Sequence, residues 1–384
     1  MFKTFIVCFF SASALYAASD VTIEVKVPTT TPQAATVFIA GNASGLGNWD
    51  PGKVKLKKKN KDTWFFKGDF DKEIIEYKFT LGSWASVEKS ASANDIENRR
   101  ETVRGKKMTI KNEVKSWSAG GAERKHTITG RIDVIEDFPS KILKNTRRIQ
   151  VWLPPSYEKS GKSYPVLYMH DGQNVFDECG SFIGAEWGAD EACDLLIKSG
   201  KIQEIIIVAV DNKGEKRIYE YAPFEDSKRG GGGGDLYARF IVSELKPFID
   251  GKYRTLKDRD NTAVCGSSLG GLISLYMGLK YWEVFSGIGV LSPAFFWADY
   301  AIFDYVKERE MTLPARVWLD IGTAEGGKMK DGITDAVRDC RKMRALLEKK
   351  GIELKYFEDA GAPHNETAWR KRFPAVLEYL FKKK

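Results

Sequence analysis

A serine flanked by glycines follows a short apolar segment in the C-terminal half of the chain. Residues 262–265 are Thr-Ala-Val-Cys, and Gly266 and Gly270 stand on either side of Ser268. A Gly-x-Ser-x-Gly sequence at a sharp strand-to-helix turn exposes the serine hydroxyl as a nucleophile. We expect the backbone to cross itself too closely at 266 and 270 for a Cβ atom, so that glycine is needed there. Apolar residues with helical spacing follow from 269 to 279, which favours this interpretation over an ordinary glycine-rich turn.

A serine hydroxyl becomes a strong nucleophile only when a neighbouring base takes its proton. The chain offers three histidines for this role, His126, His170 and His364. In serine hydrolases with this type of turn the chain order is serine, acid and histidine. Only His364, which follows the last expected strand, comes after Ser268. We predict His364 as the base, and the alternative is that it has only a structural role.

The base needs a carboxylate that orients its ring and stabilises the imidazolium. Glu325 lies in the loop directly after the expected strand 316–321, in the sequence Gly322-Thr-Ala-Glu325, and can turn back over the end of the sheet. We predict Glu325 as this acid. Asp320, within the strand, and Asp331, at an expected helix start, are the alternatives.

The negative oxygen formed during acyl transfer needs two backbone N–H donors. One is expected from Leu269, the residue after the nucleophile. The other is expected from the loop after strand 165–169, where Gly172 allows a turn and either Gln173 or Asp171 presents the N–H group.

Buried-type strands alternate with amphipathic helices over the C-terminal two thirds of the chain. This pattern predicts an α/β domain with a mostly parallel central sheet covered on both faces. The glycine run 230–234 is expected to be a flexible loop near the site, with Asp235 as the N-cap of the next helix. The expected strands are 148–153, 165–169, 205–210, 262–265, 287–291, 316–321 and 353–357, and the expected helices are 185–199, 237–249, 336–350 and 366–381.

Short strands with alternating polarity precede that domain. They are expected at 21–27, 35–40, 64–68, 76–80 and 107–111, and they predict a small antiparallel β-sandwich. Trp64 alternates within a strand and is expected in the core, whereas Trp49 and Trp84 lie in loops, where exposed rings suit stacking on sugars. The predicted organisation is a signal peptide at 1–18, the β-sandwich at 19–116, a linker at 117–126 and the α/β domain at 127–384.

The first 18 residues have the pattern of an export signal. Lys3 supplies a positive charge, residues 5–15 are apolar, and Ala17 and Ala18 offer a cleavage site. No later segment has the 18 or so apolar residues of a membrane helix. The sequence therefore predicts a secreted protein without an integral membrane segment.

Composition narrows the range of partners and cofactors. The formal net charge is +8, but basic and acidic residues are interleaved, which is typical of a solvated surface, and we expect no nucleic-acid partner. The cysteines at 179, 193, 265 and 340 lack metal-ligand spacing, so buried thiols are expected. A disulfide between Cys179 and Cys193 is the alternative in an exported protein. No metal or organic cofactor is expected.

Four segments mark the first domain: Ala40-Gly-Asn-Ala-Ser-Gly-Leu-Gly-Asn-Trp-Asp-Pro51, Glu76-Tyr-Lys-Phe79, Gly82-Ser-Trp84 and Glu97-Asn-Arg99. In their order and spacing the domain resembles the starch-binding domain family. It implies that Trp49 and Trp84 stack on two glucose rings, while Lys78 and Asn98 hydrogen-bond sugar hydroxyls. The alternative is a sandwich that only supports the domain after it.

Several motifs mark the second domain: Tyr168-Met-His-Asp-Gly-Gln-Asn-Val-Phe176, Trp187-Gly-Ala-Asp-Glu191, Gly266-Ser-Ser-Leu-Gly-Gly271, Asp320-Ile-Gly-Thr323 and His364-Asn-Glu-Thr-Ala-Trp369. With these motifs the domain resembles the esterase D-type family of esterases, which have the α/β-hydrolase fold. That family includes feruloyl and acetyl xylan esterases of carbohydrate esterase family 1 and enterobactin-type siderophore esterases. The resemblance implies a serine carboxylesterase with the triad Ser268, Glu325 and His364. Candidate pocket walls are Trp187, Tyr221, Trp297 and Trp369, with core packing as the alternative.

The two resemblances together predict an exported enzyme that hydrolyses acetyl or feruloyl esters on a carbohydrate or plant-wall polysaccharide through an acyl-serine intermediate. Two alternatives stay open. One is a hydrolase of siderophores or other small esters, and the other is a glycan-binding protein with a vestigial hydrolase domain.

Overall fold

The computed structural model describes residues 18–70, 74–91, 96–103, 107–118, 126–181, 184–309, 315–327, 329 and 331–383. The expected export signal lies outside these residues except for Ala18, and so do residues 119–125 of the expected linker. The chain divides into two compact units, Met1–Ala122 and Glu123–Lys384.

The first unit contains two four-stranded sheets. One has the order β4 (Lys57–Lys58), β5 (Thr63–Phe70), β1 (Ala18–Lys26) and β9 (Met108–Glu113); the other has β3 (Val54–Lys55), β2 (Phe38–Gly41), β6 (Ile74–Thr80) and β8 (Arg99–Thr102). A short pair, β7 (Glu88–Lys89) and β10 (Ser116–Trp117), completes it. Pairing is antiparallel except between β1 and β9, which run parallel. Alternate residues such as Val21, Ile23 and Val25 are fully buried between the sheets, together with Trp64, as a half-buried strand requires.

The second unit is built on one eight-stranded sheet. Its order is β11 (Arg131–Ser140), β12 (Asn145–Leu153), β14 (Ile206–Val210), β13 (Val166–His170), β17 (Thr262–Ser267), β18 (Gly287–Leu291), β19 (Arg316–Gly322) and β20 (Glu353–Asp359). The last six strands in this order are parallel to one another, and β12 is antiparallel to both of its neighbours. Because the parallel strands share one direction, the loops after β13, β17 and β19 emerge at the same end of the sheet.

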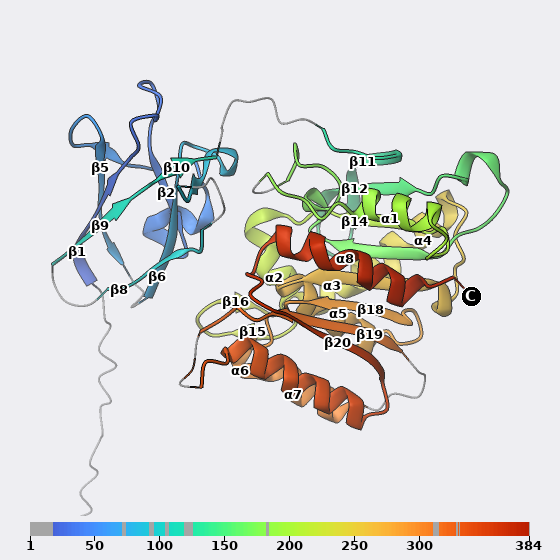
Figure 1. The fold of residues 1–384 in the computed structure, drawn as a ribbon. Helices are drawn as coiled ribbons and strands as arrows, with labels where there is room; N and C mark the ends of the chain where they lie inside the picture. The colour runs from blue at the N-terminus through green and yellow to red at the C-terminus, as the bar shows by residue number, and fades with distance from the viewer. Residues whose placement is uncertain are drawn as a thin grey trace, which may run out of the picture. The chain divides into compact units, whose positions relative to one another are not determined.

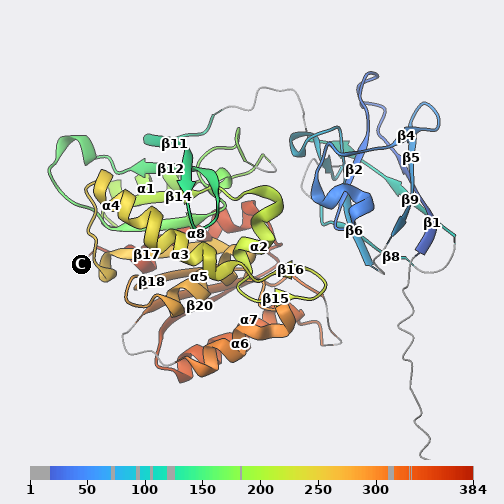
Figure 2. The same cartoon turned by 180° about the vertical axis from the view of Figure 1, so that it is seen from behind.

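Helices cover both faces of this sheet. Helices α1 (Ala189–Lys198) and α8 (Glu366–Phe381) cover the face seen in Figure 1. The opposite face, seen in Figure 2, carries α3 (Gly234–Phe240), α4 (Lys246–Lys252) and α5 (Leu269–Lys280). Each face of the sheet has its own hydrophobic core, and strand β13 contributes to both. Val166 and Tyr168 pack with α3, α4 and α5, while Leu167 and Met169 pack with α1 and α8. The remaining helices are α2 (Arg217–Tyr221), α6 (Trp297–Glu308) and α7 (Asp335–Lys349).

The structure corrects two local expectations. Gly230–Gly231 form a short strand that pairs with Glu225–Asp226, so this part of the glycine run is an ordered hairpin. Helix α3 begins at Gly234 after Gly233 as its N-cap, which places Asp235 inside the first turn.

The helix expected at 237–249 is divided into three parts. A π-helical turn, Ile241–Leu245, lies between α3 and α4, and Pro247 follows it at the start of α4. Proline has no N–H group to continue the α-helical hydrogen bonds, which accounts for the break.

Candidate active site

Ser268 lies at the turn between β17 and α5. Its φ is 58° and its ψ −123°, a conformation that is unfavourable for a residue with a side chain. Hydrogen bonds hold the turn on both sides: Ser268 N donates to Leu291 O at 3.0 Å, and Ala294 N donates to Ser268 O at 3.1 Å. The backbone is therefore fixed while the half-buried side chain stays accessible.

The two motif glycines differ in what a side chain would meet. A Cβ atom at Gly266 would lie 2.8 Å from the backbone of Gly270, which forbids any larger residue. A Cβ atom at Gly270 would lie 3.5 Å from His170 and Asp171, an ordinary contact distance. The expectation that both positions require glycine is thus wrong for 270. The second tight position is Gly271, where a Cβ atom would lie 2.9 Å from Leu291 O.

Glu325 and His364 are in direct contact. Glu325 Oε2 and His364 Nδ1 are 2.6 Å apart, and Glu325 Oε1 accepts hydrogen bonds from Gly322 N at 2.8 Å and from Ser292 Oγ at 2.6 Å. A Cβ atom at Gly322 would lie 2.2 Å from Ala362 O and 2.6 Å from Glu325 Oε1, so glycine lets the two loops meet. The bond at Nδ1 leaves Nε2 as the nitrogen available to act as a base.

Electrostatics keep Glu325 ionised. Burial acts to raise the pKa of its carboxyl, but the hydrogen bonds from His364, Ser292 and Gly322 outweigh burial, and the pKa is lowered overall. His364 is 38% exposed at its side chain, whereas Glu325 is 2% exposed. Asn365, directly after His364, caps α8 by accepting a hydrogen bond from Ala368 N at 3.0 Å, which fixes the end of the histidine loop.

Within the described residues, no hydrogen bond joins His364 to Ser268. Such a bond often tightens only when substrate is in place.

The alternative acids occupy other positions. Asp320 is fully buried, and its Oδ2 accepts a hydrogen bond from Trp318 Nε1 at 2.8 Å. Burial raises the pKa of Asp320 to about 7. Asp331 is exposed, lies before α7 and pairs with Arg338. Of the three carboxylates, Glu325 is the one bonded to His364.

Ser292, Trp369 and Arg372 hold Glu325 and His364 in place, a role that was not predicted from the sequence. Ser292 Oγ accepts hydrogen bonds from Trp369 Nε1 at 2.9 Å and from Arg372 NH2 at 2.7 Å while it donates to Glu325. The Trp369 ring meets the His364 ring edge-on, with 5.0 Å between centroids. Helix α8 therefore reaches both members of the pair. A serine directly after the buried segment 287–291 was the available signal.

The loop after β13 contains the other expected site residues. Asp171 has a left-handed backbone, with φ 56°, and its N–H group donates to Tyr221 Oη at 3.0 Å. Its carboxylate binds Arg217 through two 2.7 Å hydrogen bonds. Because the Asp171 N–H group is already used, Gln173 is the better placed of the two expected donors. Leu269 begins α5 directly after Ser268.

The expected wall residues are buried in the core. Trp187, Tyr221, Trp297 and Trp369 are all nearly inaccessible. Trp187 packs edge-on against Phe373, 5.4 Å between centroids. The core-packing alternative is the one that fits these four side chains.

The first unit brings two of its expected sugar contacts together. The rings of Trp49 and Trp84 lie 6.3 Å apart, tilted by 36°, and both are half-buried. Lys78 Nζ donates to Ile96 O at 2.6 Å, and Asn98, two residues later in the sequence, is exposed. All four residues belong to the first unit.

Among the residues that the structure describes, two groups of side chains have the composition of a metal site. The carboxylates of Glu186, Asp190 and Glu191 have oxygens within 4.8 Å of one another. Burial raises the pKa of Glu186 to about 7 and that of Asp190 to about 8. Arg370 lies 2.9 Å from Glu186 and supplies a positive charge there. The second group is His126, Asp177 and Cys179.

All four cysteines in the described chain are free thiols. Cys193, Cys265 and Cys340 are buried as expected, whereas Cys179 is half-buried, and Cys179 and Cys193 are not joined. In the part of the chain that the structure describes, no helix is both long and apolar enough to cross a membrane.

Comparison with known families decides the class of protein. Residues 140–380 match the esterase family described as "Putative esterase". The chain belongs to this esterase family. Residues 19–113 of the esterase match the starch-binding domain family, in agreement with the resemblance drawn from the sequence. The protein is a carboxylic ester hydrolase, as predicted.

Individual relatives agree with this assignment. The esterase is 32% identical over 246 residues to the uncharacterized protein YjcH of Bacillus subtilis (strain 168), covering 63% of this chain and 95% of the relative. It is 26% identical over 268 residues to an endo-1,4-beta-xylanase/feruloyl esterase of Xylanibacter ruminicola, covering 68% of this chain and 33% of that protein. The crystal structure of the BES protein from Bacillus cereus superimposes with a TM-score of 0.54 at 20% identity, over 67% of this chain and 98% of that one. The predicted α/β-hydrolase fold with a preceding β domain is confirmed.

Proposed function

We propose that this esterase is a secreted serine carboxylesterase that removes acetyl or feruloyl groups from a carbohydrate or plant-wall polysaccharide. Ser268 is the nucleophile, His364 the base and Glu325 the acid that orients it. The observation that carries the chemistry is the 2.6 Å contact between Glu325 and His364. This pair lies in loops at the same end of the parallel sheet as Ser268.

The reaction proceeds in two halves. His364 Nε2 takes the proton of Ser268 Oγ as this oxygen attacks the ester carbonyl carbon, and the resulting oxyanion is held by the N–H groups of Leu269 and Gln173. The intermediate collapses, the imidazolium gives its proton to the departing sugar oxygen, and an acyl-serine remains. A water molecule then repeats the attack with His364 as base. Release of the carboxylic acid restores Ser268.

The choice of a carbohydrate ester rests on the first unit. A starch-binding family match in the same chain as an esterase favours a substrate attached to a glycan. Rings such as Trp49 and Trp84, side by side and partly exposed, provide a surface on which sugars stack. Secretion rests on the sequence pattern of residues 1–18.

Removing the nucleophile tests the mechanism. Ser268→Ala is expected to lower kcat on p-nitrophenyl acetate by about 10³-fold or more, with an unchanged far-UV circular dichroism spectrum. A fluorophosphonate probe should label the wild type and not the variant. Turnover that survives in the variant, or a wild type that the probe does not label, would exclude an acyl-serine at 268.

A hydrolysis panel separates the substrate classes. Acetylated xylan, feruloylated arabinoxylan and a ferric catecholate ester should be compared at equal enzyme concentration. Faster release of acetate or ferulate is the expected result. Preference for the catecholate ester would instead indicate a siderophore hydrolase.

A further inference from the structure

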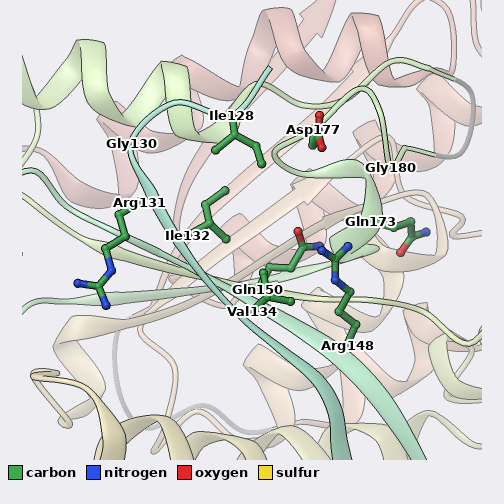
Figure 3. Close-up of a pocket in the computed structure, with 10 residues that line it drawn as sticks. All are labelled: Ile128, Gly130, Arg131, Ile132, Val134, Arg148, Gln150, Gln173, Asp177 and Gly180. Carbon is green, nitrogen blue, oxygen red and sulfur yellow. The ribbon is translucent and has the colours of Figure 1, made fainter. Parts of the chain in front are cut away.

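A pocket of about 410 Å³ lies beside the proposed oxyanion loop, in the second unit. This volume is within the usual range of roughly 300–1,000 Å³ for small-molecule sites. Figure 3 shows its lining from three segments: the start of β11 with the residues before it, strand β12, and the loop from 173 to 180. None of these residues belongs to the triad.

One side of the pocket is apolar. Ile128, Ile132 and Val134 line it, and Ile128 and Val134 are 45% and 42% exposed. Ile132 and Val134 are two residues apart on β11 and therefore face the same side of the strand. Apolar side chains that are exposed to this extent offer a surface on which the C–H face of a ring can pack.

The remaining lining is polar and held in place. Gln150 Nε2 donates to Gly172 O at 3.1 Å and to Asp211 Oδ1 at 3.0 Å, and Gln173 Oε1 accepts from Asn212 N at 3.2 Å. Asp177 accepts hydrogen bonds from His126 Nδ1 at 2.7 Å and from the backbone of Cys179 at 3.1 Å. Amide, guanidinium and carboxylate groups beside an apolar strip match the hydroxyl edge and C–H face of a sugar.

The pocket adjoins the proposed reaction centre through one turn. Gln173 lines the pocket and is also the expected second oxyanion donor. Two residues before it, Asp171 lies 3.5 Å from the Cβ position of Gly270, which is two residues after Ser268. With about 3.8 Å between consecutive Cα atoms, these steps place Gln173 within about 20 Å of Ser268.

We propose that this pocket is a subsite for a sugar ring on the alcohol side of the scissile ester. The inference rests on the proposed function, because it assigns a place to the carbohydrate part of that substrate. The open, amphipathic lining favours a sugar over the acyl group, since an acyl pocket would enclose its ligand in apolar side chains.

Filling the pocket tests the proposal. Gly180 lines it, a Cβ atom there meets no atom within 4 Å, and its φ is outside the left-handed region. Gly180→Trp therefore places a large ring at the pocket without backbone strain. Gly251, in α4, has the same open surroundings and lies outside the pocket, so Gly251→Trp is the matched control.

The measured quantity is the ratio of kcat/KM for esterified xylo- or malto-oligosaccharides to kcat/KM for the p-nitrophenyl ester of the same acid. We expect this ratio to fall about tenfold in Gly180→Trp and to stay within about twofold in Gly251→Trp. Because both substrates share the acyl group, the ratio reports on the alcohol side alone. Ile128→Ala, which shortens an exposed side chain, should lower the ratio about threefold if Gly180→Trp fails to fold.

Three results would overturn the subsite. They are an unchanged ratio in the pocket variants, an equal fall in Gly251→Trp, or a change only in preference between p-nitrophenyl ferulate and p-nitrophenyl acetate, which would make the pocket an acyl site. Wild-type protein that cleaves neither type of ester would instead refute the proposed function itself.

Discussion

Ser292 Oγ lies 2.6 Å from Glu325 Oε1, while His364 Nδ1 is bonded to the other oxygen of the same carboxylate. The carboxylate of Glu325 is thus held between the hydroxyl of Ser292 and the ring of His364. Ser292 is itself fixed by Arg372 and Trp369, so the orientation of Glu325 depends on helix α8. We infer that Ser292 is a positioning residue for the acid.

Ser292→Ala should lower kcat about 10- to 100-fold with little change in KM, because the acid loses a hydrogen bond that orients it. The bond from Ser292 also lowers the pKa of Glu325, so the pKa of this carboxyl should be higher in the variant than in the wild type. Ser286→Ala is the control, since this buried serine lies at the other end of β18. Equal losses in both variants would mean that Ser292 acts only through stability.

Gly266→Ala and Gly270→Ala should differ sharply. The first places a Cβ atom 2.8 Å from backbone and should cost about 2 kcal/mol or more of unfolding free energy. The second meets only ordinary contacts at the start of a helix, where alanine is favoured over glycine by about 0.5–1 kcal/mol. Thermal unfolding of both variants measures the difference. Equal destabilisation of the two variants would contradict the ordinary contact distances at position 270.

Asp190→Asn should stabilise the protein in a pH-dependent way. Burial raises the pKa of Asp190 to about 8, whereas the unfolded carboxyl has a pKa of about 3.9. Between these values the folded state keeps a proton that the unfolded state has lost, so wild-type stability falls as pH rises through this range. The asparagine still accepts the hydrogen bond from Thr129 N.

The melting temperature of Asp190→Asn, measured relative to wild type, should therefore rise between pH 4 and pH 8. About 2–4 °C is expected for each kcal/mol gained. A difference that does not vary with pH would show that Asp190 titrates normally.

The double variant Trp49→Ala, Trp84→Ala should bind insoluble starch about tenfold more weakly, because each ring stacked on a sugar contributes on the order of 0.5–1.5 kcal/mol. Its kcat/KM on p-nitrophenyl acetate should stay within about twofold of wild type. Trp64→Phe, a change in the core, should leave starch binding unaltered. Unchanged binding of the double variant to starch and to xylan would make the first unit a structural support.

The sequence alone predicts the α/β sheet and places its reactive side chains in the loops that follow particular strands. Buried strands are runs of apolar residues, so 262–265 and 316–321 could be recognised and Glu325 located after the second. The scarcity of histidine pointed to His364. Each of these inferences uses local order along the chain, which the fold preserves.

Features that depend on distant segments could not be predicted. Strand β11 carries charged residues between half-exposed apolar ones, as an edge strand can, and it was missed. The contacts of Ser292 with Arg372 join positions 80 residues apart. The distances at Gly270 follow from how closely α5 approaches the loop after β13, which a motif cannot specify.

Helix α8 follows Ser268, Glu325 and His364 in the sequence, and this order has a consequence during protein synthesis. Ser268, Glu325 and His364 all leave the ribosome before Trp369 and Arg372, which secure the acid and the base. The first unit can fold while the second unit is still being made, since domains fold as units from the N-terminus. The second unit instead completes its site only after α8 has been synthesised, and a message truncated before α8 yields a chain with all three proposed triad residues but without Trp369 and Arg372 to hold Ser292.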